Sequence, residues 1–284
     1  MPTSNKVEKI FSRLESDYKM LVEKEYEVVG VFLYGSQNYK MDTDHSDIDT
    51  KAIVLPKFDD IVDSKDWVSK DIFLESGEKV DVKDVRLMFD CYKKQNINFL
   101  ETLFTPYMYI NPEYSGLFLG AVVKNREKIA RYNPRKAVLS MYGNMKTKYK
   151  SMLHRAPHNE KEIDLYGYSL KDFHHIARIN DFIQRYAEGQ ELYEATLVPK
   201  DVPTLIAYKE KALDLEEAKS LAEKMIADTE KLVNEKVEEW KDLQPNVEVD
   251  TLLRDTQRML IKHSLYKELV DGNPDAMRNK IFLI

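Results

Sequence analysis

The sequence predicts an α+β fold in which a small mixed β-sheet with flanking helices is followed by an α-helical domain. Short runs rich in β-branched and aromatic residues occur only before Asp84. From Asp84 onward, apolar residues recur with a period near 3.6, which is typical of helices. The chain has 284 residues, 43% of them hydrophobic, enough for one large or two modest domains. We expect a sheet-containing domain over residues 1–115 and a helical domain over residues 116–284.

Composition excludes several classes of protein. The single cysteine, Cys91, cannot form an intramolecular disulfide, and the longest uncharged apolar stretch, 116–123, is much shorter than the roughly 20 residues of a membrane-spanning helix. The first residues lack the pattern of a signal peptide. We therefore expect a cytoplasmic protein with no membrane partner. The net charge of −6 argues that any site for a polyanion is local.

The first elements are predicted from their apolar spacing. Residues 7–21 repeat apolar side chains at three- and four-residue steps, which predicts an amphipathic helix. Residues 27–34 form a short β-branched and aromatic run that ends at Gly35 and Ser36, which predicts a strand and a sharp turn. A second strand is expected over 47–55, closed by Pro56.

The remaining elements are a hairpin and a series of helices. Residues 72–74 and 79–82 flank a turn that contains Gly77, which predicts a β-hairpin. Helices are expected over 137–153, 170–186, 215–240 and 251–269, with no further strong strand.

Two acidic residues open the second predicted strand. Asp47 and Asp49 are two residues apart, so on a strand their side chains point to the same face. Two carboxylates this close repel each other unless a hard cation such as Mg²⁺ or Mn²⁺ binds them together with substrate phosphates. Gly35 would let the backbone approach a phosphate, and the Ser36 hydroxyl could hold a phosphate oxygen.

A third carboxylate is expected to complete the metal site. Asp81 lies between Val80 and Val82 on the last predicted strand, and if that strand neighbours the second one, three acids meet in one cleft. Such a triad holds two metal ions for in-line displacement at phosphorus. Asp84 is the competing candidate, but it stands where a helix cap is needed, so we favour Asp81.

These motifs resemble a known superfamily. Gly35-Ser36 followed by Asp47-Ile-Asp49 is similar to the signature of the DNA polymerase β superfamily of nucleotidyltransferases. Within it, Tyr34-Gly-Ser-Gln-Asn-Tyr39, Val80-Asp-Val82 and Asn98-Phe-Leu-Glu-Thr-Leu-Phe104 resemble the RNA-repair-pathway polymerase-β-like family over roughly residues 25–190. The resemblance implies that Gly35 and Ser36 bind phosphate and that Asp47, Asp49 and Asp81 are catalytic metal ligands. It supports the reaction type more than the acceptor.

A basic segment lies downstream of these motifs. Residues 121–155 contain ten Lys or Arg and one acid, Glu127. Tyrosines are interleaved, so the segment is a candidate surface for a nucleic-acid backbone, although it is also consistent with a triphosphate site or a solvated helical face. The candidate nucleic-acid contacts are Arg135, Lys136, Lys146, Lys148 and Lys150.

A second basic group is predicted on the helix over 170–186. Lys171, His175 and Arg178 are spaced to share one face, as a helix beside a triphosphate would present, whereas His174 points to another side. A solvent-facing role for the group is the alternative. His45 lies beside the acidic pair and is interpreted as a loop residue more readily than as a substrate contact.

The sequence therefore predicts a metal-dependent nucleotidyltransferase that binds a nucleoside triphosphate. We expect transfer of a nucleoside monophosphate to an acceptor hydroxyl, with an RNA or tRNA end favoured because of the basic segment. Nucleotidylation of a protein or a small molecule, as in toxins or antibiotic-modifying enzymes, is the first alternative. A non-catalytic, antitoxin-like binding module is the second.

Overall fold

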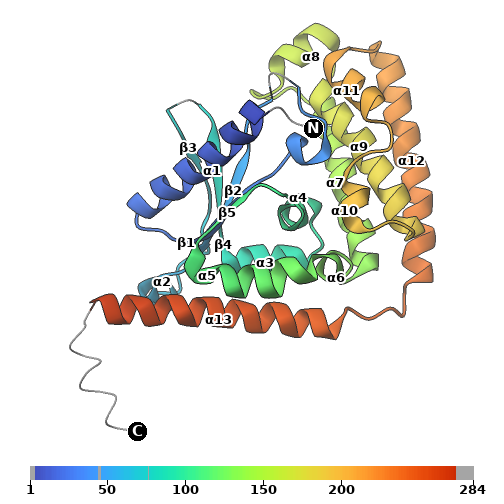
Figure 1. Ribbon diagram of the computed structural model, residues 1–284. Helices are drawn as coiled ribbons and strands as arrows, with labels where there is room; N and C mark the ends of the chain where they lie inside the picture. The colour runs from blue at the N-terminus through green and yellow to red at the C-terminus, as the bar shows by residue number, and fades with distance from the viewer. Residues whose placement is uncertain (1–3, 44–45, 76, 273–284) are drawn as a thin grey trace.

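A five-stranded mixed sheet lies beside a layer of helices (Figure 1). The computed structural model describes residues 4–43, 46–75 and 77–272. The sheet order is β3-β4-β2-β1-β5; β2 and β4 are parallel and the other neighbours are antiparallel. The strands are β1 (Glu27–Leu33), β2 (Thr50–Leu55), β3 (Ser69–Phe73), β4 (Lys79–Asp84) and β5 (Met108–Ile110).

Helices make up most of the rest of the described chain. The α-helices are α1 (Ser4–Glu23), α2 (Phe58–Val62), α3 (Val85–Lys93), α4 (Ile97–Leu100), α5 (Pro112–Leu117), α6 (Arg126–Ala130), α7 (Pro134–Met152), α8 (Glu160–Tyr166), α9 (Leu170–Glu188), α10 (Tyr193–Leu197), α11 (Val202–Glu210), α12 (Leu215–Glu239) and α13 (Val247–Gly272). Short 3₁₀ or π segments are η1 (Ser36–Tyr39), η2 (Glu101–Leu103), η3 (Phe118–Val122) and η4 (Val123–Asn125). The α+β class, the hairpin and the long helices predicted from periodicity are confirmed.

The two faces of the sheet bury different cores. Ala52 and Val54 of β2 pack with Leu14 of α1, whereas Ile53 belongs to the larger core that includes α3 and the helical layer. Because side chains alternate along a strand, Lys51 lies on the same face as Ile53, toward the helical layer. This alternation decides which polar residues near the end of β2 face the helices.

The second strand begins later than predicted. Antiparallel pairing with β1 starts at Leu33 and Thr50, so Asp47 and Asp49 precede β2 instead of opening it. The reason is that the chain leaves the sheet at Gly35 to form η1, which removes the neighbour that a longer strand would need. One further bond, from the Tyr34 amide to the Asp49 carbonyl at 3.0 Å, keeps Asp49 beside the end of β1.

One short strand after Asp84 was not predicted: β5 pairs with β1 at the sheet edge. Its three residues are too few for a periodicity signal. In the helical layer, α9 contacts α7, α11 and α12, and α13 returns along the bottom of Figure 1 to contact α3 and α5. The domain boundary after residue 115 stays a prediction. None of the described helices has the length and apolarity needed to cross a membrane.

Candidate active site

Gly35 makes a close approach to Asp49 possible. It ends β1 with φ +90°, and a Cβ there would lie 3.3 Å from Asp49 Oδ2. Any other residue would therefore be strained in its backbone and crowded against the carboxylate. Ser36, half-buried, follows as the first residue of η1, and its hydroxyl has no hydrogen-bond partner among the described residues. This hydroxyl is available to a ligand.

The acidic pair lies at the mouth of this loop. Asp47 is exposed and Asp49 is half-buried. Burial raises the pKa of Asp49 and the charge of Asp47 raises it further, while Lys171 of α9 is the cation that lowers it most. The tertiary structure thus brings Lys171 close to the acids although more than 100 residues separate them in sequence. Gln37 of η1 holds the backbone at Asp47, because its Nε2 donates to the Asp47 carbonyl at 3.0 Å.

Asp81 lies on the predicted face but is already paired. The parallel register of β2 and β4 sets it opposite Lys51, which forms a buried ion pair with it, and Lys83 Nζ lies 2.7 Å from its Oδ1. Burial by itself would raise the pKa of Asp81, but the two lysines outweigh burial and lower it. Lys51 Nζ also lies 4.6 Å from the ring centroids of Tyr34 and Phe99.

Asp84 has a structural role. It is the N-cap of α3, where its carboxylate accepts a hydrogen bond from the Arg86 amide at 2.8 Å, as its position in the sequence predicted. Among the residues that the structure describes, no group of three or more His, Cys, Asp or Glu side chains is arranged to hold a metal ion. Assignment of Asp81 as a metal ligand stays a prediction.

Helix α9 presents an arginine without hydrogen-bond partners to the loop. Arg178 is only 4% exposed, and its guanidinium carbon lies 4.2 Å from the centroid of the Tyr39 ring. Its Nε and Nη1 are buried and have no hydrogen-bond partner in the described part of the chain. A buried guanidinium with free N–H groups is costly unless an anion completes it.

The two histidines of α9 take different directions, as predicted. His175 is half-buried, and burial, followed by the charge of Arg178, lowers its pKa well below the usual value. His174 is turned to α11, where its Nδ1 lies 2.8 Å from the Leu205 carbonyl oxygen, and burial lowers its pKa to about 4. Both rings are therefore neutral at pH 7, and the positive charge on this face comes from Lys171 and Arg178.

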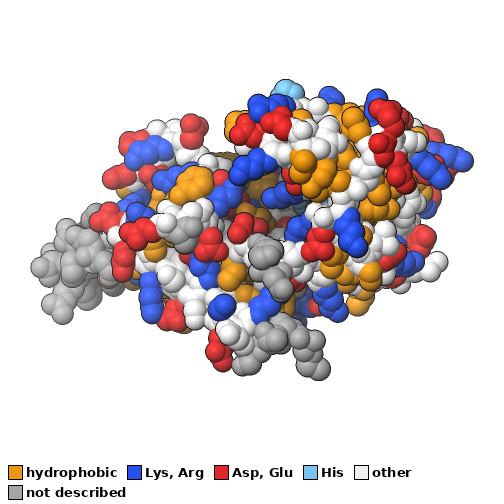
Figure 2. All heavy atoms as spheres, turned by 90° about the horizontal axis from the view of Figure 1, so that it is seen from above, with side chains coloured by type: hydrophobic (Ala, Val, Ile, Leu, Met, Phe, Trp, Pro, Cys, Tyr) orange, Lys and Arg blue, Asp and Glu red, His pale blue; other side chains and the backbone are white. Residues whose placement is uncertain are grey.

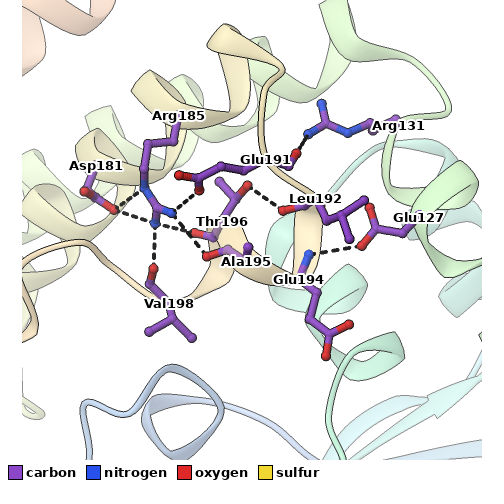
Figure 3. Close-up of polar contacts among 10 residues, drawn as sticks. All are labelled: Glu127, Arg131, Asp181, Arg185, Glu191, Leu192, Glu194, Ala195, Thr196 and Val198. Atoms are coloured by element: carbon purple, nitrogen blue, oxygen red, sulfur yellow. Dashed lines mark hydrogen bonds and ion pairs between the residues drawn. The ribbon is translucent and has the colours of Figure 1, made fainter.

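Arg185, a second buried arginine on α9, has the hydrogen-bond partners of a structural residue. Arg185, also 4% exposed, is saturated with acceptors (Figure 3). Its guanidinium donates to the carboxylates of Asp181 and Glu191 at 2.6–3.1 Å. It also donates to the carbonyls of Ala195, Thr196 and Val198, and so it orders the chain that follows α9. Arg178 lacks any such set of acceptors.

Sequence reasoning missed Glu101. This residue is 3% exposed, and its Oε2 accepts hydrogen bonds from the Gly35 amide at 3.2 Å and from the Tyr39 hydroxyl. Burial raises its pKa to about 7, an effect that Arg178 opposes. The available signal was one acidic residue inside the apolar run from Phe99 to Phe104, which is unusual for a solvent-facing carboxylate.

Seen from above, one face of the protein has a hollow in its middle, with Lys and Arg side chains gathered around it (Figure 2). Lys209 of α11 spans the two parts of the protein, since its Nζ lies 3.3 Å from Ser46 Oγ, three residues before Asp49. His45 lies outside the described residues.

The basic segment divides into two groups. Four of the five predicted nucleic-acid contacts are exposed along one side of α7; this exposed stripe is Arg135, Lys136, Lys146 and Lys150. Lys148 points to the opposite side, where its Nζ lies 2.9 Å from Asp172 Oδ1 of α9. Beyond α7, Arg126, Lys128 and Arg155 form ion pairs with acidic residues. Of the five predicted contacts, the four on the exposed stripe form no ion pair within the described chain.

Comparison with known proteins assigns no family. No protein-family model matches the chain, and no curated protein does. A solved structure of a nucleotidyltransferase-like protein from Exiguobacterium sibiricum is similar over 81% of this chain and 75% of its own, with 13% sequence identity and a TM-score of 0.29. Since a similarity this low carries neither family nor activity, function is inferred below from the site alone.

Proposed function

We propose that this protein is a metal-dependent nucleotidyltransferase that transfers a nucleoside monophosphate from a nucleoside triphosphate to an acceptor hydroxyl. The observation that carries the proposal is the meeting of opposite charges at one loop. Asp49 lies against Gly35, and Lys171 is the cation that lowers its pKa most. The guanidinium of Arg178, whose Nε and Nη1 have no partner among the described residues, lies against Tyr39 of the same loop. Carboxylates that can bind a cation, next to cations that can bind an anion, fit a metal-bound triphosphate.

The acidic pair fits one hard cation. Asp47 is open to solvent, and burial, with the nearby charge of Asp47 in addition, raises the pKa of Asp49, so a cation bound there would stabilise both carboxylates. Mg²⁺ or Mn²⁺ there would neutralise phosphate charge and activate the attacking hydroxyl. Asp81 would become a ligand of a second ion only after its ion pair with Lys51 opens. The two-metal arrangement is therefore a further part of the proposal, and it requires that rearrangement.

The protein's own groups would bind and orient the triphosphate. Gly35 lets the backbone approach the phosphates, Ser36 offers its hydroxyl, and Lys171 and Arg178 offer charge-assisted donors to the oxygens that leave as pyrophosphate. In the reaction the acceptor oxygen bonds to the α-phosphorus, the bond from that phosphorus to the bridging oxygen breaks, and the hydroxyl proton is released to water. The neutral His175 would add a hydrogen bond without charge.

We propose an RNA end, as in tRNA, as the acceptor. The support is the exposed stripe of α7, in which Arg135, Lys136, Lys146 and Lys150 lie along one side of a single helix. A line of cations in a chain of net charge −6 is a local site for a polyanion backbone. A small-molecule acceptor would make no use of this stripe.

Labelling decides the reaction and the acceptor together. The purified protein is incubated with each radiolabelled nucleoside triphosphate, with Mg²⁺ and with either total RNA or total protein, and the Asp49→Asn variant serves as the control. We expect label in the RNA fraction with wild type only. Label in the protein fraction or in a small molecule would show that RNA is not the acceptor. The absence of metal-dependent label from every fraction would contradict the proposed function.

A further inference from the structure

Glu101 is a buried carboxylate that the proposed chemistry does not use directly. It begins η2, directly after α4, and its neighbours Leu100, Thr102 and Leu103 are all buried. A carboxyl group in an apolar core is costly unless several groups contact it. Its position therefore requires an explanation, and its contacts provide one.

Its contacts converge on the loop that would bind phosphate. One oxygen, Oε2, accepts hydrogen bonds from the Gly35 amide at 3.2 Å and from the Tyr39 hydroxyl, so it contacts both the residue that precedes η1 and the last residue of η1. Asn38 of the same segment lowers the pKa of this carboxyl, while its Nδ2 donates to the Leu33 carbonyl at 3.0 Å. A single side chain thus secures the loop on either side of Ser36.

The backbone of Gly35 needs such an anchor. Its φ of +90° and ψ of −156° belong to a region that glycine alone enters readily, and a glycine is also the residue with the most freedom to leave it. Without Glu101, the Gly35 amide would lose the acceptor that it has in the described part of the chain. The loop would then lose its preorganisation.

Glu101 also balances the charge of Arg178 without using up its donors. The carboxyl interacts electrostatically with the guanidinium, yet Nε and Nη1 of Arg178 remain without hydrogen bonds. The buried pair therefore leaves two N–H groups free beside the loop.

We propose that Glu101 is a positioning residue that holds the Gly35–Ser36 loop in its phosphate-binding conformation; this inference rests on the proposed function. It acts through the Gly35 amide and the Tyr39 hydroxyl and does not itself touch substrate. Glu101→Met keeps the apolar volume but removes the acceptor, whereas Glu101→Gln keeps an oxygen that can accept the same N–H. Glu101→Asp keeps the charge but shortens the side chain by one methylene.

Glu127 offers a matched control. Its carboxylate likewise accepts backbone hydrogen bonds, from Tyr193 at 2.9 Å and from Glu194 at 3.2 Å, but at the start of α10 rather than at the loop (Figure 3). Glu127→Met should therefore disturb a comparable hydrogen-bond pattern without touching the Gly35 amide.

The test measures two quantities on the full chain: calorimetric affinity for inorganic tripolyphosphate with Mg²⁺, and hydrogen exchange of the Gly35 amide by NMR. We expect Glu101→Met to weaken tripolyphosphate binding about tenfold or more and to speed Gly35 exchange. Glu101→Gln should restore both to near wild type, and Glu127→Met should change neither. If the Met variant folds poorly, Glu101→Asp should show the same two losses.

The outcomes distinguish a failure of the proposed function from a failure of the role proposed for Glu101. Wild-type protein that does not bind tripolyphosphate contradicts the proposed function. Wild-type protein that binds it, together with equal binding and equal Gly35 exchange in the Met and Asp variants, contradicts the role of Glu101 alone. A Gln variant as impaired as the Met variant also overturns positioning through the hydrogen bond.

Discussion

Arg178 and Arg185 lie seven residues apart on α9, are equally buried, and differ completely in their partners. Arg185 donates to two carboxylates and three carbonyls, whereas Nε and Nη1 of Arg178 have no acceptor among the described residues. Burial removes both guanidinium groups from water, which is unfavourable, but only in Arg185 do protein acceptors offset the lost hydration. This difference distinguishes an arginine with a structural role from one whose N–H groups are available to bind an anion.

Replacement of each arginine by methionine should separate these roles. Arg185→Met leaves buried acceptors unpaired, so we expect a loss of about 3–5 kcal/mol in unfolding free energy. Arg178→Met removes a buried charge with unpaired donors, and Glu101, whose pKa is already raised, can take up a proton in its absence; we expect a much smaller loss of stability than in Arg185→Met, while the KM for the nucleoside triphosphate rises at least about tenfold. Thermal unfolding and saturation kinetics measure both, and equal destabilisation by the two variants would show that Arg178 is structural.

Loss of either acid of the pair should abolish transfer and leave the fold intact. Asp47→Asn and Asp49→Asn each remove a ligand charge from an open site, and in the absence of metal each relieves repulsion between the two carboxylates. Because burial and Asp47 raise the pKa of Asp49, the apo Tm of Asp49→Asn should equal or exceed that of wild type. Turnover is measured at saturating Mg²⁺, and near-normal turnover in either variant would exclude the metal-dependent mechanism.

Asp81 and Asp84 should respond differently to substitution. Asp81→Asn leaves Lys51 buried beside a neutral partner, so we expect about 3 kcal/mol or more of destabilisation together with loss of turnover. Asp84→Ala removes the N-cap of α3 and should cost about 1 kcal/mol with turnover retained. Specific activity is compared well below each variant's Tm. If the Asp84→Ala protein were inactive and the Asp81→Asn protein active, Asp84 would be the third acid and Asp81 the structural residue.

The raised pKa of Glu101 predicts a pH dependence of stability. With a folded-state pKa of about 7 against an ordinary value of 4.5, the folded protein retains a proton that the unfolded chain releases. This contribution is fully present below pH 4.5 and is lost as pH rises through 7, with a magnitude of up to about 3 kcal/mol.

His174 and His175 contribute with the opposite sign, because their lowered pKa values cost stability as pH falls below their usual value. The measurement is therefore the difference between the unfolding free energies of wild type and Glu101→Gln from pH 5 to pH 8. Stability of wild type relative to the Gln variant should decline across this range. A flat difference would mean that Glu101 titrates near its ordinary pKa.

The exposed stripe of α7 should set the salt dependence of RNA binding. Replacement of Arg135, Lys146 and Lys150 by alanine should reduce the slope of log affinity against log salt by about two, at about 0.7 for each single-strand phosphate contact. Tripolyphosphate affinity should not change, because Arg178 and Lys171 lie at the loop and not on the stripe. Alanine at the exposed Lys9, Lys24 and Lys262 is a matched control that should leave the slope intact. An unchanged slope in the stripe variant would leave the RNA proposal without its main support.

The sequence by itself determined most of the helices and strands, and it identified many of the residues of the candidate site. Periodicity located the long helices, β-branched runs located β1, β2 and the hairpin, and glycine marked the turn at Gly35. The N-cap role of Asp84 and the turning of His174 to another side of α9 also followed from local spacing. Such features depend on residues within a turn or two of one another, so a single segment contains the information.

Only the tertiary structure decided which charges are paired. The parallel register of β2 and β4 set Lys51 against Asp81, and the packing of α7 on α9 turned Lys148 away from its exposed neighbours to Asp172. The tertiary fold also left Nε and Nη1 of Arg178 without an acceptor among the described residues, and it brought Glu101 to Gly35 across 66 residues of sequence. Whether a charge is satisfied depends on neighbours that folding brings from distant segments, and no local pattern specifies those neighbours.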